Sequence, residues 1–284
     1  MHLVDSFRRQ YSPEILPYCR RSIACKFFCA SAVETLQGII CLSKMRKGIN
    51  ISAALGILGF FNLSLIIQVI ILHYFNGMAY VRGRYTLLKK DLEAVIAETR
   101  FLNPNRIGVF VTTCCSLADR LEEIAQAQSD LQALIERLPR TYQVQIVCFI
   151  YTAYSSLLAN VYAIFTLHKY GVTEEIFPNF IVVTYTAHLV MSLADFWINA
   201  YNLFSLLDAH EEMIKLLSEI SVLQSALDQR LEAVITNFTL NLVRHPMRLQ
   251  FLGFFDINRS AAFAMLNSLL SQAIILIQID IQNK

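Results

Sequence analysis

The stretch SAAFAMLNSLLSQAIILIQIDI (Ser260–Ile281) lies near the C-terminus and decides the class of fold. It is long enough to span a membrane, because about 20 apolar residues cross a hydrocarbon core of roughly 30 Å. Along a helix, a polar stripe interrupts its aliphatic surface. The stripe consists of Asn267, Ser271, Gln278 and Gln282, with Ile275 between them. A polar stripe is unfavourable on a helix that is surrounded by lipid. The pattern therefore favours a membrane helix whose polar face contacts protein partners or water.

The composition of the whole chain indicates an integral membrane protein. Its 284 residues are 55% hydrophobic and 16% charged, whereas about a quarter of a soluble domain is charged. The formal net charge of +2 comes from interleaved acidic and basic residues, which argues against a nucleic-acid surface. The seven cysteines show no zinc-site spacing, and their odd number argues against a closed disulfide framework.

Five apolar segments are long enough to cross a bilayer, and they predict an all-α, polytopic membrane helix bundle. The N-terminal segment 1–22 is polar. The first two spans (23–73) and the third and fourth spans (144–207) are followed by long polar segments, 74–143 and 208–258. A last span (259–284) ends the chain.

The long polar segments retain the periodicity of amphipathic helices. Apolar residues recur every three or four positions over 88–102, 117–138 and 213–238. Asn103-Pro104-Asn105 predicts a break between the first two stretches. The third stretch predicts one helix over 208–245 that continues the fourth span and ends at Pro246. We expect these apolar faces to pack against each other and against similar helices of neighbouring subunits.

Aromatic and polar side chains gather in the third and fourth spans. A small-molecule pocket needs apolar area and a few orienting hydrogen bonds, which this combination supplies. Interface belts and ordinary packing are the alternative. The candidate ligand-binding residues are Tyr151, Tyr154, Tyr185, His188 and Trp197.

Two further observations concern ionisable residues. Glu34 lies inside the first span, where an acid is either functional or faces a polar partner for structural reasons. His188 and Asp195 are seven residues apart, which is too far for a direct pair, and no further ligands indicate a metal site.

The sequence carries no signature of an enzyme. It contains no G-x-S-x-G, no P-loop, no H-E-x-x-H and no glycine-rich dinucleotide turn. We therefore expect no catalytic activity and no cofactor. A membrane transporter is a less favoured alternative, because the sequence shows no internal repeat.

The last helix has a motif in which a pair of residues is followed by five hydrophobic residues and a second pair. Ser271-Gln272, the residues 273–277 and Gln278-Ile279 occupy these positions. This motif resembles the signature of the insect gustatory receptors, a family of seven-helix chemoreceptors, in which the pairs are Thr-Tyr and Gln-Phe. Gln278 is identical and Ser271 is a conservative change. The preceding run LGFFDINRSAAFAML (Leu252–Leu266) is similar to the lead-in of that family, and the order of spans matches from Ile23 onward.

The resemblance implies a ligand-gated, non-selective cation channel in the plasma membrane of chemosensory neurons. Such receptors are built as tetramers, here a homo- or hetero-tetramer with other gustatory receptor subunits. The last helix would line a central pore, with Ser271, Ile275, Gln278 and Gln282 on the pore side. A small-molecule tastant bound within a subunit would shift the closed–open equilibrium. Family members that respond to sugars tend to carry an acid at the position of Ala273, so we expect bitter compounds or contact pheromones.

Family members have seven spans, so the five spans here correspond to helices three to seven and we expect that the first two are lacking. A non-conducting or truncated receptor subunit is therefore the alternative function. Four arginines before the first span favour a cytoplasmic N-terminus, whereas three basic residues also favour the cytoplasm for the loop 43–50. We adopt the orientation of the family, in which 1–22, 74–143 and 208–258 are cytoplasmic and the long helices form an anchor region.

Overall fold

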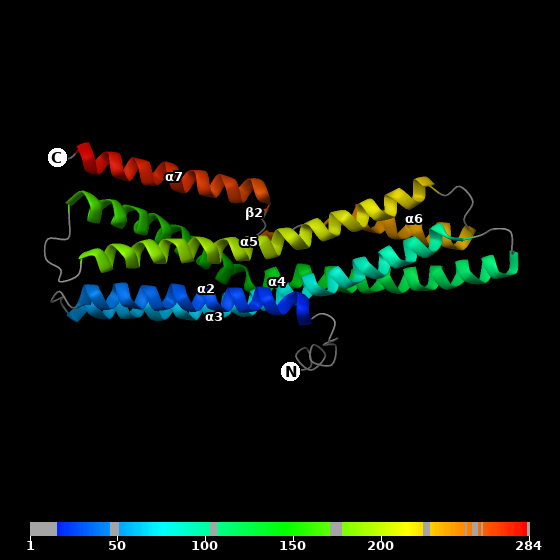
Figure 1. Ribbon diagram of the computed structural model, residues 1–284, viewed down its shortest axis with the longest axis horizontal. Coiled ribbons are helices and arrows are strands. Elements are labelled where there is room, and N and C mark those ends of the chain that lie inside the picture. Colours follow the sequence, from blue (N-terminus) through cyan, green and yellow to red (C-terminus); the bar gives the residue numbers. More distant parts are fainter. Residues whose placement is uncertain are drawn as a thin grey trace. The chain divides into compact units, whose positions relative to one another are not determined.

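The computed structural model (Figure 1) describes residues 16–45, 51–102, 107–170, 178–223, 228–247, 249–251, 255–256 and 258–282. Its helices are α2 (Leu16–Met45), α3 (Ile51–Arg100), α4 (Ile107–Tyr170), α5 (Pro178–Leu223), α6 (Gln229–Arg244) and α7 (Arg259–Gln282). Two strands of two residues each, β1 (Gln250–Phe251) and β2 (Phe255–Asp256), pair antiparallel with Gln250 opposite Asp256. The predicted all-α membrane helix bundle is confirmed.

In the part of the chain that the structure describes, five helices are long and apolar enough to cross a membrane, namely α2, α3, α4, α5 and α7. Large apolar side chains are exposed along them, among them Phe28, Leu63, Val190 and Ile274. Such an apolar surface is favourable in the hydrocarbon core of a membrane, where the backbone polar groups are hydrogen-bonded within the helix. The chain is therefore a membrane protein, as its composition indicates.

Two prolines bear on where the helices end, and one predicted helix needs correction. Pro139 lies inside α4, which continues unbroken from the polar segment into the third span. A proline removes one backbone hydrogen bond but does not have to end a helix that is packed on both sides of it. The single helix predicted over 208–245 is wrong, because α5 ends at Leu223 and α6 begins at Gln229. The predicted break at 103–105 and residues 46–50 of the predicted basic loop 43–50 lie outside the described residues, whereas 43–45 belong to α2.

Asp228 is the reason that a new helix begins at Gln229. It is the N-cap residue of α6, with extended backbone, and its side chain accepts a hydrogen bond from the backbone N–H of Arg230. A short polar side chain at this position satisfies a donor that the first turn leaves open. A proline disfavours helical backbone in the residue before it. Pro246 follows His245, and α6 accordingly ends at Arg244.

Replacing Asp228 by alanine is expected to lower the free energy of unfolding by about 0.5–2 kcal/mol, because the cap is lost. Asp228→Asn keeps the capping oxygen and serves as the matched control. Thermal unfolding of the purified chain in detergent measures both variants, and equal melting temperatures for the alanine and asparagine variants would contradict the role of the cap.

The chain divides into two compact units. Unit 1 comprises Met1–Cys19, Met78–Pro139 and Asn202–Leu249, and unit 2 comprises the remaining residues. The helices α2, α3, α4 and α5 each contribute one part to either unit. The divisions lie close to the limits that the sequence suggests for its membrane and polar segments, and the cytoplasmic location of the polar segments stays a prediction.

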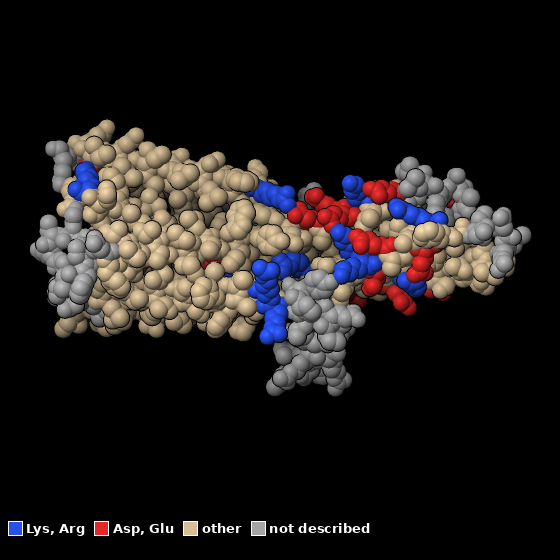
Figure 2. All heavy atoms as spheres, in the orientation of Figure 1, with Lys and Arg blue, Asp and Glu red and all other residues tan. Residues whose placement is uncertain are grey.

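Unit 1 buries the apolar faces of four helices. Leu92 of α3, Leu121 of α4, Leu217 of α5 and Leu231 of α6 are at most 1% exposed. Charged side chains gather over these elements in Figure 2, whereas the elements of unit 2 show few. Exposed ion pairs join these helices, namely Lys89–Glu212, Arg120–Glu98 and Arg230–Asp119. Ion pairs of this kind contribute about 0–1 kcal/mol each, so apolar burial is the larger source of stability.

A buried hydrogen-bond network centred on His210 crosses the interior of unit 1. Its Nδ1 atom bonds with the hydroxyl of Tyr85 at 3.0 Å, and its Nε2 atom accepts from the backbone N–H of Met247 at 3.4 Å. Because an amide N–H can only donate, Nε2 carries no proton, and in a neutral ring the proton is on Nδ1. We call these residues, with Gln128 and Gln132, the His210 network.

The glutamines extend the His210 network to the end of α6. Gln128 donates from Nε2 to the hydroxyl of Tyr85 at 3.0 Å and lies within 2.9 Å of the Oε1 atom of Gln132. Gln132 in turn donates to the carbonyl oxygen of His245 at 2.9 Å. The network thus ties the segment that leaves α6 to helices α3, α4 and α5 by two backbone contacts.

Unit 2 contains most of α2, parts of α3, α4 and α5, the β1–β2 pair and α7. The N-cap of α7 is Asn258, whose side chain accepts from the N–H of Ala261 at 2.7 Å and whose carbonyl accepts from Ala262. Residues 252–254 and 257 of the lead-in motif lie outside the described residues. The cap fixes where the last membrane helix starts.

Candidate ligand pocket and pore-facing helix

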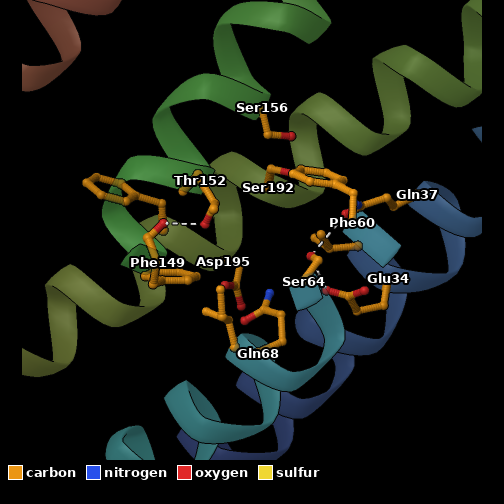
Figure 3. Close-up of a pocket in the computed structure, with 14 residues that line it drawn as sticks. Glu34, Gln37, Phe60, Ser64, Gln68, Phe149, Thr152, Ser156, Ser192 and Asp195 are labelled. Atoms are coloured by element: carbon orange, nitrogen blue, oxygen red, sulfur yellow. Dashed lines mark hydrogen bonds between the residues drawn. The ribbon is translucent and has the colours of Figure 1, made fainter. Parts of the chain in front are cut away.

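A pocket lies among α2, α3, α4 and α5 within unit 2 (Figure 3). It has an empty volume of about 570 Å³, including the part that opens outward. Aromatic rings of Phe60, Phe149 and Phe196 line it together with polar groups that include Glu34 and Gln68. Apolar rings that provide contact area, with polar groups that can orient a ligand, are features of small-molecule sites.

One wall of the pocket contains a buried ion pair. The Nζ atom of Lys26 lies 2.6 and 2.7 Å from the two carboxylate oxygens of Asp195, and their side chains are 0% and 3% exposed. The same Nζ atom is 5.6 Å from the ring centroid of Phe149, within the range of a cation–π contact. Asn199 donates to the backbone carbonyl of Asp195 at 2.8 Å. Since the two charges compensate each other, the pair is a neutral part of the wall.

Glu34, by contrast, has no cationic partner among the described residues. Its Oε1 atom accepts a hydrogen bond from the hydroxyl of Ser64 at 3.2 Å. Its Oε2 atom and the Oε1 atom of Gln68 are buried and find no hydrogen-bond partner in the described part of the chain. Buried polar atoms are usually paired, so these two oxygens call for an explanation.

The five residues that the sequence suggested as ligand contacts do not line this pocket. Tyr151 and Trp197 are 72% and 55% exposed. Tyr154 hydrogen-bonds with the hydroxyl of Ser268 on α7. His188 is buried and bonds through Nδ1 to Asn160 at 2.9 Å, while Tyr185 is half-buried. Their role in ligand binding stays a prediction.

Sequence reasoning missed the pocket that these helices form, although two of its signals are visible in the sequence. Glu34 is an acid inside the first span, and Ser64 and Gln68 are polar residues one helical turn apart in the second span. Nothing in the sequence indicated that Lys26 and Asp195 would pair across 169 residues.

The polar stripe of α7 is exposed on the structure. Ser271, Gln278 and Gln282 are exposed, and Ile275 is 52% exposed. The residues of α7 that its own chain buries are Leu269 and Ala273. Each lies two positions from Ser271, which is the opposite side of a helix with 3.6 residues per turn. The stripe therefore faces away from the chain's own helices.

The buried side of α7 is held at its C-terminal end by Asp280. This carboxylate accepts hydrogen bonds from Tyr162 at 3.2 Å and from Tyr170, and it pairs with Lys169 at 3.0 Å. All three partners belong to α4. Asp280 lies seven residues after Ala273, two turns along the same side, so these contacts keep the polar stripe turned outward.

A family model described as a seven-transmembrane chemosensory receptor matches residues 1–283 of the chain. Among similar proteins of Drosophila melanogaster, gustatory receptor 59d is 48% identical over 285 residues, which cover 100% of this chain and 73% of that protein. Gustatory receptor 36a is 31% identical, over 99% of this chain and 73% of the relative. A gustatory receptor for bitter taste, 93a, is 26% identical over 59% of this chain and 38% of its own length. The chain belongs to the seven-transmembrane chemosensory receptor family, and its relatives within that family are gustatory receptors.

Proposed function

We propose that the chain is a subunit of a ligand-gated, non-selective cation channel that responds to small-molecule tastants. The observation that carries this proposal is the exposed polar stripe of α7, which lies opposite the side that packs on the same chain. In a membrane, a polar face that its own chain leaves uncovered is stable only against other protein or water. Symmetric assembly of several copies, here a tetramer, supplies both by surrounding a central pore with the same face.

The pocket of unit 2 supplies the second element of such a receptor, a place for the ligand. A ligand opens the channel when it binds the open state more tightly than the closed state. Relatives whose names specify bitter taste, 93a and 22e, support bitter compounds as the ligand class. Contact pheromones are retained in the proposal, and sugars are not, because Ala273 replaces the acid of sugar-responsive members. The location that fits is the plasma membrane of chemosensory neurons.

The proposal is tested by expressing the chain in a cell line and recording whole-cell current. Quinine and denatonium are the probes for bitter compounds, and sucrose and trehalose are the probes for sugars. We expect inward cation current with at least one of the bitter probes and none with the sugars. A chain that reaches the cell surface and conducts with none of the probes contradicts the proposal and favours a non-conducting receptor subunit.

Replacing Gln278 by leucine is expected to lower single-channel conductance several-fold or to alter ion selectivity, because an apolar ring at a constriction opposes hydration. The matched control is Gln272→Leu, which makes the same chemical change at an exposed position about a quarter turn from the stripe. Conductance and reversal potential measured in patches check both variants. Unchanged permeation in Gln278→Leu places this residue away from the pore.

A further inference from the structure

We propose that the pocket of unit 2 binds a small organic cation, whose charged nitrogen is held between Glu34 and Gln68. The inference rests on the proposed function in one respect, namely that the pocket receives a small molecule. It goes further because it names the chemical class of that molecule and the two residues that recognise it.

Two hydrogen-bond acceptors of the pocket wall are left without a donor among the described residues. The hydroxyl of Ser64 has one proton, while Glu34 Oε1 at 3.2 Å and Gln37 Oε1 at 3.5 Å both lie within its reach. Glu34 Oε2 and Gln68 Oε1 are buried and have no partner among the described residues. A buried acceptor without a donor is costly, so a ligand that brings N–H groups gains free energy at this place.

The residues that carry the two open acceptors are neighbours on the pocket wall. Gln68 follows Ser64 by four residues, about one helical turn along α3, and Ser64 contacts Glu34 of α2 directly. Figure 3 shows Glu34, Ser64 and Gln68 on the walls formed by α2 and α3. Gln68 is 9% exposed, so its amide is directed into the bundle rather than toward the surrounding solvent. An ammonium group has up to three N–H donors and can serve both oxygens.

Charge selects a cation over a neutral or anionic donor. Lys26 and Asp195 neutralise each other, so Glu34 is the acid of this wall with which a bound cation would pair in its ionised form. A buried charge is stable when a partner of opposite sign is hydrogen-bonded to it. The rings of Phe60 and Phe196 provide apolar area for the hydrocarbon part of the ligand.

The test compares two probes that differ in one group, 2-phenylethylamine and 2-phenylethanol. The amine is protonated at pH 7, because an aliphatic ammonium group has a pKa of about 10, whereas the alcohol is neutral. Saturation binding of the tritiated amine, and its competition by the alcohol, are measured on the full chain in lipid nanodiscs. We expect the chain to bind the amine more tightly than the alcohol.

The decisive variant is Glu34→Gln, which keeps the shape of the side chain and removes its charge. Loss of a charge-assisted hydrogen bond is expected to weaken amine binding about 10- to 100-fold and to leave alcohol binding within about two-fold. Glu136→Gln makes the same change at an exposed site of unit 1 and should change neither affinity. The double variant Glu34→Gln/Gln68→Glu moves the charge from α2 to the facing wall on α3 and should restore amine binding.

Three results overturn the inference. The first is that the amine shows no saturable binding, the second is that its affinity is the same in Glu34→Gln as in the unmodified chain, and the third is that the substitution weakens the binding of amine and alcohol equally. None of them bears on the channel, which is judged by the current recordings. Conversely, binding of the amine that depends on Glu34, in a chain that passes no current, supports the inference and contradicts the proposed channel.

Discussion

Replacing Asp195 by leucine is expected to lower the free energy of unfolding by about 3–5 kcal/mol, because Lys26 would remain buried without its counter-charge. Both carboxylate oxygens contact the ammonium group, and the lysine side chain is fully buried, so water cannot replace the lost partner. Thermal unfolding of the chain in detergent measures the loss. The same measurement on Lys26→Leu should show a similar loss of unfolding free energy, because that variant leaves the carboxylate of Asp195 buried without its counter-charge.

The double variant Lys26→Leu/Asp195→Leu separates the value of the pair from the cost of breaking it. Burying two charges is itself expensive, and an apolar pair of similar volume is often as stable or more stable. We therefore expect the double variant to unfold within about 1 kcal/mol of the unmodified chain. If each single variant were as stable as the unmodified chain, the pair would not be buried as the structure has it.

Replacing His210 by leucine is expected to destabilise unit 1, because it leaves the N–H of Met247 and the hydroxyl of Tyr85 without their shared partner. Each unpaired buried group costs about 1–3 kcal/mol. The cost should appear locally as faster hydrogen exchange at the amide of Met247 and globally as a lower melting temperature.

His245→Leu is the matched control for the His210 network. The side chain of His245 is exposed, and this residue enters the network only through its backbone carbonyl, which the substitution keeps. We expect its melting temperature to match that of the unmodified chain. Equal exchange of the Met247 amide in His210→Leu and His245→Leu would contradict the role assigned to the imidazole.

The sequence predicts well whatever depends on local pattern. The five membrane helices follow from runs of apolar residues, and the end of α6 follows from Pro246. The start of α6 is not predicted from the sequence, because Asp228 falls within one continuous amphipathic stretch. Only the structure shows that its side chain caps a new helix. Periodicity detects a helical face but does not detect an interruption that preserves the phase of that face.

The candidate site depends on contacts between residues far apart in the chain, and the sequence does not predict which of these residues meet. Lys26 lies near one end of the first span in the sequence, yet in the structure it is fully buried against Asp195. The tyrosines and tryptophan that suggested a pocket are amphipathic residues that also suit a lipid-facing surface, and Tyr151 and Trp197 are indeed largely exposed. Residue type alone cannot separate these two environments.

The small share of α7 that packs on its own chain has a consequence for the life of the protein in the cell. Under the proposed assembly, a newly made copy would insert a last helix whose amides and hydroxyl meet lipid until other copies arrive, a state that membrane helices tolerate poorly. Assembly would then be a condition for the lasting stability of each copy, and solitary copies would be removed by the machinery that clears misfolded membrane proteins. The number of receptors at the cell surface would follow the supply of partner chains rather than the rate of synthesis of any one of them.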